Sequence, residues 1–223
     1  SDAAAYTGLI ERNRIQIAVV DGIPCRNSDF SFDGKYYWAN DDYTLTELKN
    51  NDWTYIDSDS CRGYRYVKDG KILKDCIEKI GAYYYCFDSN GVMQTNGVVT
   101  IWNPSAKTYY ADENGHLKKN FWFSRSRELT FDKGNTEPNL YNQILYFGDN
   151  FESCSGFQTI DGKLYYFASH NMVDAPSLII DTTVTVDQKN YLCLQDGAVV
   201  ELKDNDWTFA EDNQYYVKDH TIL

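Results

Sequence analysis

The sequence is poor in the residues and patterns that many functional classes need. Its 223 residues include only three histidines and two methionines. No apolar run reaches the roughly 18 residues of a membrane-spanning helix, since the longest, at 15–20, has the length of a strand. Basic residues are outnumbered, 21 Lys and Arg against 33 Asp and Glu, for a formal net charge of −12. This charge argues against nucleic acid or an anionic membrane as partner and suits a neutral sugar or a cationic ligand, or solubility alone.

Motifs of catalysis and metal binding are missing as well. The chain has no G-x-S-x-G, S-x-x-K or H-E-x-x-H pattern. Its many carboxylates form no local pattern that would mark a glycosidase pair. The acidic stretches at 40–42 and 57–60 lack the spacing of an EF-hand and are better explained as solvated turns. We therefore predict no catalytic residue, no metal site and no cofactor.

The six cysteines leave two alternatives open. None forms a C-x-x-C pair, and no histidine lies nearby at the spacing of a zinc site. An even count permits three disulfides, and the dispersed positions fit six thiols equally well. The cysteines are Cys25, Cys61, Cys76, Cys86, Cys154 and Cys193.

Aromatic residues are abundant and point to the fold class. They make up 16% of the chain, with 19 Tyr, 11 Phe and 5 Trp, and Gly, Asn and Asp punctuate the sequence between them. This composition is typical of an all-β protein with many turns. The segment 73–81, "LKDCIEKIG", has helical spacing, but among the surrounding turns we expect it to connect two hairpins.

A duplication links two distant parts of the chain. "ELKNNDWTY" at 47–55 matches "ELKDNDWTF" at 201–209, and "YVKDGKIL" at 66–73 matches "YVKDHTIL" at 216–223. The two tryptophans, Trp53 and Trp207, are 207 − 53 = 154 residues apart. Between the matched pieces the first copy has four extra residues, (66 − 53) − (216 − 207) = 4, in a loop-like "DSDSCRG".

A shorter repeat runs through most of the sequence. Its unit is a tyrosine-rich strand, an Asp/Asn/Gly turn and a second short strand, as in "YYYCFDSNGVMQT" at 83–95. Asp-Gly and Asn-Gly between alternating strands are strong hairpin signals, because both turn residues need positive φ. A single hairpin cannot bury its own aromatic face, so we predict a solenoid of stacked hairpins. Residues 121–139 fit the unit poorly and are expected to form a longer repeat or an irregular connection.

Two segments carry a resemblance to a known family. Residues 81–97 contain an aromatic triplet, an Asp-Ser-Asn-Gly turn, Met93 and Thr95, and residues 156–167 read "GFQTIDGKLYYF". They resemble the cell-wall-binding repeat family, which includes choline-binding repeats, glucan-binding repeats of glucansucrases and receptor-binding repeats of clostridial toxins. The resemblance implies a β-solenoid of hairpins, no catalysis and a repetitive ligand such as a glucan, a host glycan or choline. Choline-type repeats usually begin with Gly-Trp, where this chain has Gly156-Phe157.

These patterns predict an organisation and a function. We expect N-terminal strands or a cap at 1–32 and a hairpin-repeat solenoid at 33–223, within a longer array that carries further domains. We predict a non-catalytic module of a secreted or cell-surface bacterial protein that binds glucan or a related polysaccharide by aromatic stacking at several weak sites. Choline-mediated attachment to the cell wall is the first alternative. A structural spacer or protein-interaction module without a small ligand is the second.

Candidate ligand contacts are the aromatics that strand alternation leaves half exposed. Flat Tyr and Trp rings stack on sugars and also surround ammonium groups. Within the triplet, Tyr83 and Tyr85 face one side and Tyr84 the other. Met93 follows its turn at the place where a choline-type repeat closes its cage, although filling a gap in the core explains it as well. The predicted ligand-binding residues are Trp53, Trp207, Tyr84, Trp102, Tyr110, Trp122, Tyr166 and Met93.

Overall fold

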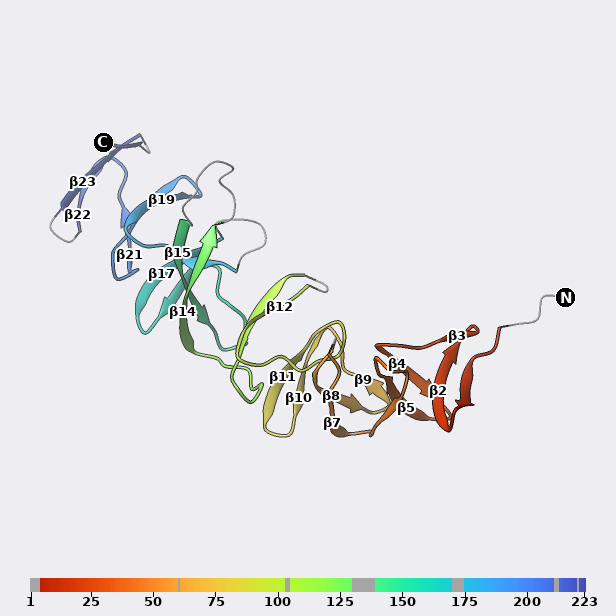
Figure 1. Cartoon of the computed structure of the whole chain (residues 1–223). Coiled ribbons are helices and arrows are strands. Elements are labelled where there is room, and N and C mark those ends of the chain that lie inside the picture. The colour runs from red at the N-terminus through yellow and green to blue at the C-terminus, as the bar shows by residue number, and fades with distance from the viewer. Residues whose placement is uncertain are drawn as a thin grey trace. The chain divides into compact units, whose positions relative to one another are not determined.

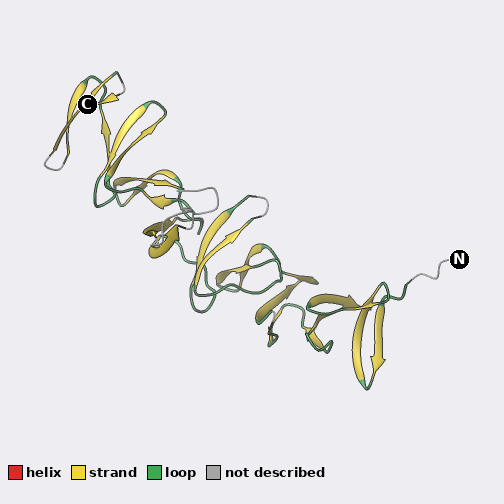
Figure 2. Ribbon diagram, turned by 45° about the horizontal axis from the view of Figure 1, so that its top comes forward, coloured by secondary structure: helices red, strands yellow, loops and turns green. Residues whose placement is uncertain are grey.

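The protein is built from strands and turns. The computed structural model describes residues 5–59, 61–102, 105–129, 139–169, 175–210, 213–219 and 221–223 (Figure 1). Within these ranges no helix occurs, and the strands form nine small antiparallel sheets (Figure 2). A membrane-spanning helix is accordingly not found in the described part of the chain. The predicted all-β class is confirmed.

Each sheet follows one plan, which the third hairpin illustrates. Strand β7 (Asp52–Ile56) pairs with β8 (Gly63–Lys68), and a short third strand, β9 (Lys71–Ile72), pairs with the end of β8. Asp69 and Gly70 make the second turn with φ of 46° and 75°. Asp tolerates this left-handed conformation and Gly adopts it without cost, so Asp-Gly marks the turn. In some units a single bridge, such as Phe87 to Met93, replaces the third strand.

The chain divides into two compact units. The first comprises Ser1–Ala106 and Tyr110–Leu117, and the second Lys107–Tyr109 and Lys118–Leu223, so the boundary falls within β13 (Lys107–Ala111). The other strands of the first unit, besides β7 to β9, are β1 (Gly8–Arg12), β2 (Ile15–Val20), β3 (Ile23–Pro24), β4 (Ser28–Phe32), β5 (Lys35–Ala39), β6 (Leu45–Leu48), β10 (Cys76–Ile80), β11 (Tyr83–Phe87) and β12 (Gly97–Ile101).

The second unit repeats the same plan. Its first hairpin has the longest strands, and short third strands follow the later ones. The strands are β14 (Phe121–Leu129), β15 (Asn139–Phe147), β16 (Gly156–Ile160), β17 (Lys163–Ala168), β18 (Ser177–Leu178), β19 (Thr182–Val186), β20 (Lys189–Cys193), β21 (Val199–Leu202), β22 (Asp206–Ala210), β23 (Asn213–Lys218) and β24 (Thr221–Ile222).

A left-handed residue precedes the first strand of most hairpins. At seven of these junctions the residue is Asn or Asp with φ between 45° and 56°, and β16 begins at Gly156 with φ of 68°. Asn, Asp and Gly are the residues that adopt this conformation most readily. The chain therefore reverses at a defined point before each new hairpin. The Asn and Asp junctions are Asn27, Asn51, Asp75, Asn96, Asn120, Asp181 and Asn205.

The predicted duplication has a structural counterpart. The N–H of Asn51 donates to the carbonyl of Val67 at 2.7 Å, and that of Asn205 donates to Val217 at the same distance. Six residues lie between Ile56 and Gly63 at the tip of one hairpin, against two between Ala210 and Asn213 in the other. The difference, 6 − 2 = 4, confirms that the extra residues of the first copy lie in a loop.

Two sequence expectations need correction. The segment 73–81 is not a connection, because its residues Cys76–Ile80 form β10 and pair with β11 along their whole length. The repeat unit also begins one strand earlier than predicted, because β11 pairs with β10, the strand before it. The residues after the turn that follows β11 contribute only a single bridge, at Met93. Residues 121–129 form β14, which pairs with β15 in a long hairpin, and residues 130–138 lie outside the described residues.

Each hairpin contributes a buried residue near the end of its second strand. These residues are at most 4% exposed, and Val67, Phe167 and Val217 belong to small cores that include side chains of a neighbouring hairpin. The six cysteines are free thiols in the structure, and Cys86 and Cys193 are fully buried. The buried strand-end residues are Val19, Ala39, Val67, Phe87, Ala111, Phe147, Phe167, Cys193 and Val217.

The buried thiols predict a loss of stability at alkaline pH. Burial raises the pKa of Cys86 to about 12, whereas a cysteine in the unfolded chain ionises near about 8.5. Because the unfolded state then releases a proton that the native state retains, stability is full below about pH 8.5 and falls until about pH 12. Between pH 7.5 and 10.5 the ionisation of this one thiol should lower the free energy of unfolding by about 3 kcal/mol.

Urea unfolding at the two pH values checks this expectation. The midpoint should fall in both proteins, and less in Cys86→Ala than in the unmodified chain, because Cys76 and Cys193 have pKa values raised in the same direction. An equal fall in both proteins would show that the Cys86 thiol does not contribute.

Candidate functional site: aromatic joints between successive hairpins

Three positions define the contact between one hairpin and the next. Position A is the second residue of a hairpin's first strand, and position B is its cross-strand partner. Position C belongs to the following hairpin, as the cross-strand partner of the third residue of its first strand. In the third hairpin, Trp53 at A pairs with Tyr66 at B, and Tyr85, opposite Glu78 in the fourth, is at C. Neighbouring residues of a strand face opposite sides, so A and B of one hairpin can meet C of the next. We call this contact a joint.

Three joints have aromatic rings at all three positions. The ring centroid of Trp53 lies 5.0 Å from those of both Tyr66 and Tyr85. Trp122 lies 4.9 Å from Tyr146 and 5.2 Å from Tyr165. In the next joint, Phe157 lies 4.7 Å from Tyr166 and 4.6 Å from Tyr191. These distances are typical of tilted and edge-to-face aromatic contacts. The sequence therefore builds one arrangement three times.

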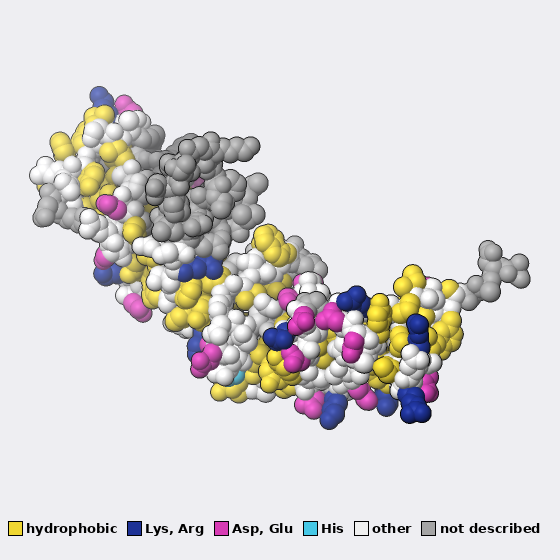
Figure 3. Space-filling model, viewed as in Figure 1, with side chains coloured by type: hydrophobic (Ala, Val, Ile, Leu, Met, Phe, Trp, Pro, Cys, Tyr) yellow, Lys and Arg dark blue, Asp and Glu magenta, His cyan; other side chains and the backbone are white. Residues whose placement is uncertain are grey.

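The last hairpin of the sequence presents the first two positions. Trp207 and Tyr216 lie 5.0 Å apart at A and B, as Trp53 and Tyr66 do in the other copy of the duplication. Trp207 is 55% exposed and Trp122 is 37% exposed. On the face that Figure 3 shows, hydrophobic side chains reach the surface in separate patches between charged ones. Large flat rings are thus accessible at several places along the chain.

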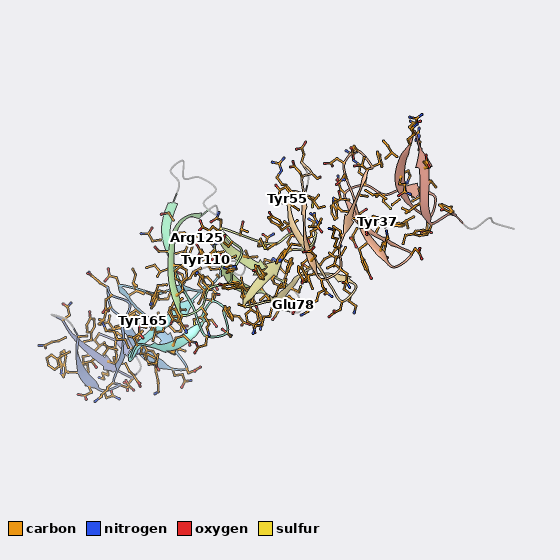
Figure 4. All side chains as sticks on the ribbon, turned by 90° about the horizontal axis from the view of Figure 1, so that it is seen from below. Tyr37, Tyr55, Glu78, Tyr110, Arg125 and Tyr165 are labelled. Carbon is orange, nitrogen blue, oxygen red and sulfur yellow. The ribbon has the colours of Figure 1, made fainter. Side chains whose placement is uncertain are left out.

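A groove opens beside Trp122. It has a volume of about 400 Å³, and Trp122 and Tyr165 form part of its wall (Figure 4 labels Tyr165). The carboxylate of Asp196 lies at the groove and accepts a hydrogen bond from Lys163 Nζ at 3.0 Å. The backbone N–H of Ala198 and the Lys163 ammonium hold the pKa of Asp196 below its usual range, so this carboxylate is charged at neutral pH. The remaining lining residues are Phe123, Ser124, Ile144 and Leu178. We call this the Trp122 groove.

The Trp122 groove has the chemistry of a shallow binding site. Its flat aromatic faces can stack on a sugar ring or lie against an ammonium group. The hydroxyl of Ser124 and the carboxylate of Asp196 can hydrogen-bond a ligand's hydroxyls. Elsewhere, no group of three or more Asp, Glu, His or Cys able to hold a metal ion occurs among the described residues.

Four of the eight predicted ligand contacts lie in these joints. Trp53 and Trp122 occupy position A in complete triads, and Tyr166 occupies position B. Trp207 occupies position A in the last hairpin. The sequence marked Trp53 and Trp207 by their repetition, and the structure places both at position A.

The other four lie outside the described triads. Tyr84 is 37% exposed, its ring 5.8 Å from Lys79 Nζ, and the triplet residue that contacts Trp53 is Tyr85. Trp102, which follows β12, is 61% exposed, and Tyr110 is half-buried on β13 (Figure 4). Met93 lies at the turn of the next hairpin, where a Cβ on Gly115 would come within 2.8 Å of its sulfur. Their role in binding stays a prediction.

The sequence did not single out the other aromatic residues of the joints. Each B residue is the cross-strand partner of an A residue, so a correct hairpin register would have found it. Each C residue comes from the following hairpin, and its pairing depends on how successive hairpins meet. The residues added by the structure are Tyr66, Tyr85, Tyr146, Phe157, Tyr165, Tyr191 and Tyr216.

Known proteins resemble the chain in sequence and in structure. No family model matches it. A glucosyltransferase-S of Streptococcus mutans is 27% identical over 167 residues, which cover 67% of this chain and 11% of the glucosyltransferase. The chain thus corresponds to a small part of that protein.

Solved structures superpose on most of the chain at low identity. Choline-binding protein F of Streptococcus pneumoniae, in the presence of a peptidoglycan analogue, is 20% identical, with 90% of this chain and 59% of that chain covered and a TM-score of 0.48. The autolysin LytC of S. pneumoniae is 16% identical, with 93% and 50% covered and a TM-score of 0.40. An alternansucrase in complex with isomaltononaose is 13% identical, with 96% and 16% covered and a TM-score of 0.36. The resemblance to the cell-wall-binding repeat family, first seen in the motifs of residues 81–97 and 156–167, is confirmed by the similarity to the streptococcal glucosyltransferase.

Proposed function

We propose that the chain is a non-catalytic carbohydrate-binding module whose aromatic joints hold successive parts of a glucan or a related polysaccharide. The observation that supports this most is the recurrence of one aromatic triad at Trp53, Trp122 and Phe157. A core needs only apolar volume, whereas the triads place flat rings at the same register and leave some of them accessible. Repeated sites of one kind suit a repeating polymer.

The Trp122 groove provides the most concrete contact surface. Its aromatic wall can stack on the apolar face of a sugar ring, while Ser124 and Asp196 lie within the same groove to bind hydroxyls. A single shallow groove of this kind binds weakly. Several joints on one chain raise the effective concentration of the next sugar segment, so the polymer is held by avidity.

The finer architecture belongs to this proposal. Triads linking consecutive hairpins support a β-solenoid, in which each hairpin buries its aromatic face against the next. We further propose a place outside the cell, in a secreted or cell-surface bacterial protein with additional domains. The similarity to part of a much longer glucosyltransferase supports both the attached domains and the choice of glucan as ligand.

Choline-type ligands are the second candidate. The charged carboxylate of Asp196 beside Trp122 and Tyr165 favours a cation, because aromatic faces and a carboxylate together stabilise an ammonium group. The two candidates differ in salt dependence. Sugar stacking is nearly insensitive to ionic strength, whereas binding of a cation near an exposed carboxylate weakens as salt is added.

A fluorescence titration of the chain distinguishes these readings. Soluble dextran, cello-oligosaccharides and choline chloride would be added separately while tryptophan emission is recorded at low and high salt. We expect a saturable change with a glucan that persists at high salt. A response to choline alone would select the second candidate. No response to any of the three would overturn the binding proposal and favour a structural spacer without a small ligand.

A further inference from the structure

One joint of the first unit has an aromatic ring only at position B and charged residues at positions A and C. It lies between the hairpin of β4 and β5 and the hairpin of β7 and β8. Position A is Asp29, its cross-strand partner at B is Trp38, and position C, opposite Thr54, is Arg65. In five other hairpins the residue at C is a tyrosine, namely Tyr37, Tyr85, Tyr165, Tyr191 and Tyr215, and in the hairpin of β14 and β15 it is Leu145.

Arg65 fills this joint with its guanidinium group. The side chain is fully buried, and its guanidinium carbon lies 3.9 Å from the centre of the Trp38 ring. One nitrogen donates a hydrogen bond to the carbonyl of Cys61 at 3.0 Å. Trp38 is only 2% exposed, in contrast to the accessible Trp122 and Trp207. A buried cation over a tryptophan face is a strong form of cation–π contact.

The surrounding charges fit a resident cation. Asp29 is the acidic group at position A, and its carboxylate also pairs with Lys74. Burial lowers the pKa of Arg65, whereas Cys61, Asp88 and, to a smaller extent, Asp29 act in the opposite direction and favour the charged form. An acidic residue at A and a basic residue at C thus stand where an aromatic triad has two of its three rings.

We propose that Arg65 is an internal ligand that closes this joint, so that its own guanidinium takes the place that a ligand would need beside Trp38. The inference rests on the proposed function, because it assumes that complete aromatic triads are binding sites. It identifies Arg65 and Asp29 as the residues that keep this joint of the first unit from binding. Trp38 therefore serves the fold, although a tryptophan with a tyrosine partner serves binding elsewhere in the chain.

Restoring the aromatic pattern tests this directly. The double variant Asp29→Trp/Arg65→Tyr gives this joint the tryptophan at A and the tyrosine at C of the Trp53 joint and keeps Trp38 at B, and tyrosine already occupies position C in five other hairpins. The indole N–H signals of the tryptophans would be followed by NMR during titration with dextran oligosaccharides. In the unmodified chain, the Trp38 signal should not shift while that of Trp122 does.

In the double variant, the Trp38 signal should shift with the ligand and the number of bound oligosaccharides per chain should rise by one. The single variant Arg65→Met is the matched control, because it removes the cation but supplies no aromatic triad, and its Trp38 signal should stay insensitive. Thermal unfolding establishes that both variants are folded. A folded double variant in which Trp122 responds and Trp38 does not would overturn the inference and leave the proposed function intact. If the Trp122 signal of the unmodified chain does not shift with the ligand, the proposed function itself is overturned.

Discussion

Replacing Trp53, Trp122 and Phe157 together by alanine should weaken glucan binding more than a hundredfold. These residues hold position A in the three complete triads, and each contacts both other rings of its joint. Truncating an aromatic at the centre of a binding site typically costs about 2 kcal/mol, or about 30-fold in Kd. Loss of all three also removes the avidity that links them.

Affinity electrophoresis in gels containing dextran measures this effect. The three single variants are compared first, and the triple variant after them. The matched control replaces three exposed aromatics outside the triads, Tyr6, Phe32 and Phe209, which are 53%, 41% and 70% exposed. This control removes as many rings and should keep its affinity within a factor of two. Equal retardation of the triple variant and the unmodified chain, with both folded, would rule out the triads as the binding sites.

The variant Phe87→Ala should show the largest loss of stability. Phe87 ends β11, is fully buried, and its ring lies 5.9 Å from that of Trp53 in the preceding hairpin. Truncating a buried phenylalanine costs about 3–5 kcal/mol, the sum of lost apolar burial and the cavity left behind. Because the ring connects two hairpins, we expect the loss to affect both, and the Trp53 site to weaken with it.

Urea unfolding followed by tryptophan fluorescence measures this loss. Phe209→Ala is the control, since its ring is 70% exposed and its removal should change the free energy of unfolding by less than about 0.5 kcal/mol. A loss below about 1 kcal/mol for Phe87→Ala would contradict the view that strand-end residues form the core between hairpins.

The turns of this protein could be predicted from the sequence, but half of each hairpin could not. Asp-Gly and Asn-Gly signals located the second strands and their turns, as at Asp69-Gly70. First strands such as "SDFSF" at 28–32 and "CIEKI" at 76–80 carry weak alternation, because their stability comes from pairing with the aromatic strand that follows. The left-handed residues before these two strands, Asn27 and Asp75, have no neighbouring Gly that would have marked them as turns.

The candidate site was predictable only in part for a related reason. Composition and repetition identified Trp53, Trp122 and Trp207, which occupy position A. Choosing between Tyr84 and Tyr85 required the register with β10 and the contact with the preceding hairpin, and the structure places Tyr85 against Trp53. The closed joint at Arg65 depends on contacts between residues distant in sequence, and no local pattern indicated it.

The central claim is that ligand enters the aromatic joints and not the closed joint at Trp38. One measurement tests it, the change of the tryptophan indole N–H signals during titration with dextran oligosaccharides. We predict saturable shifts of the Trp53 and Trp122 signals, with the signal of the buried Trp38 unchanged. Saturable shifts confined to Trp38 or Trp102, with Trp53 and Trp122 unmoved, would contradict it.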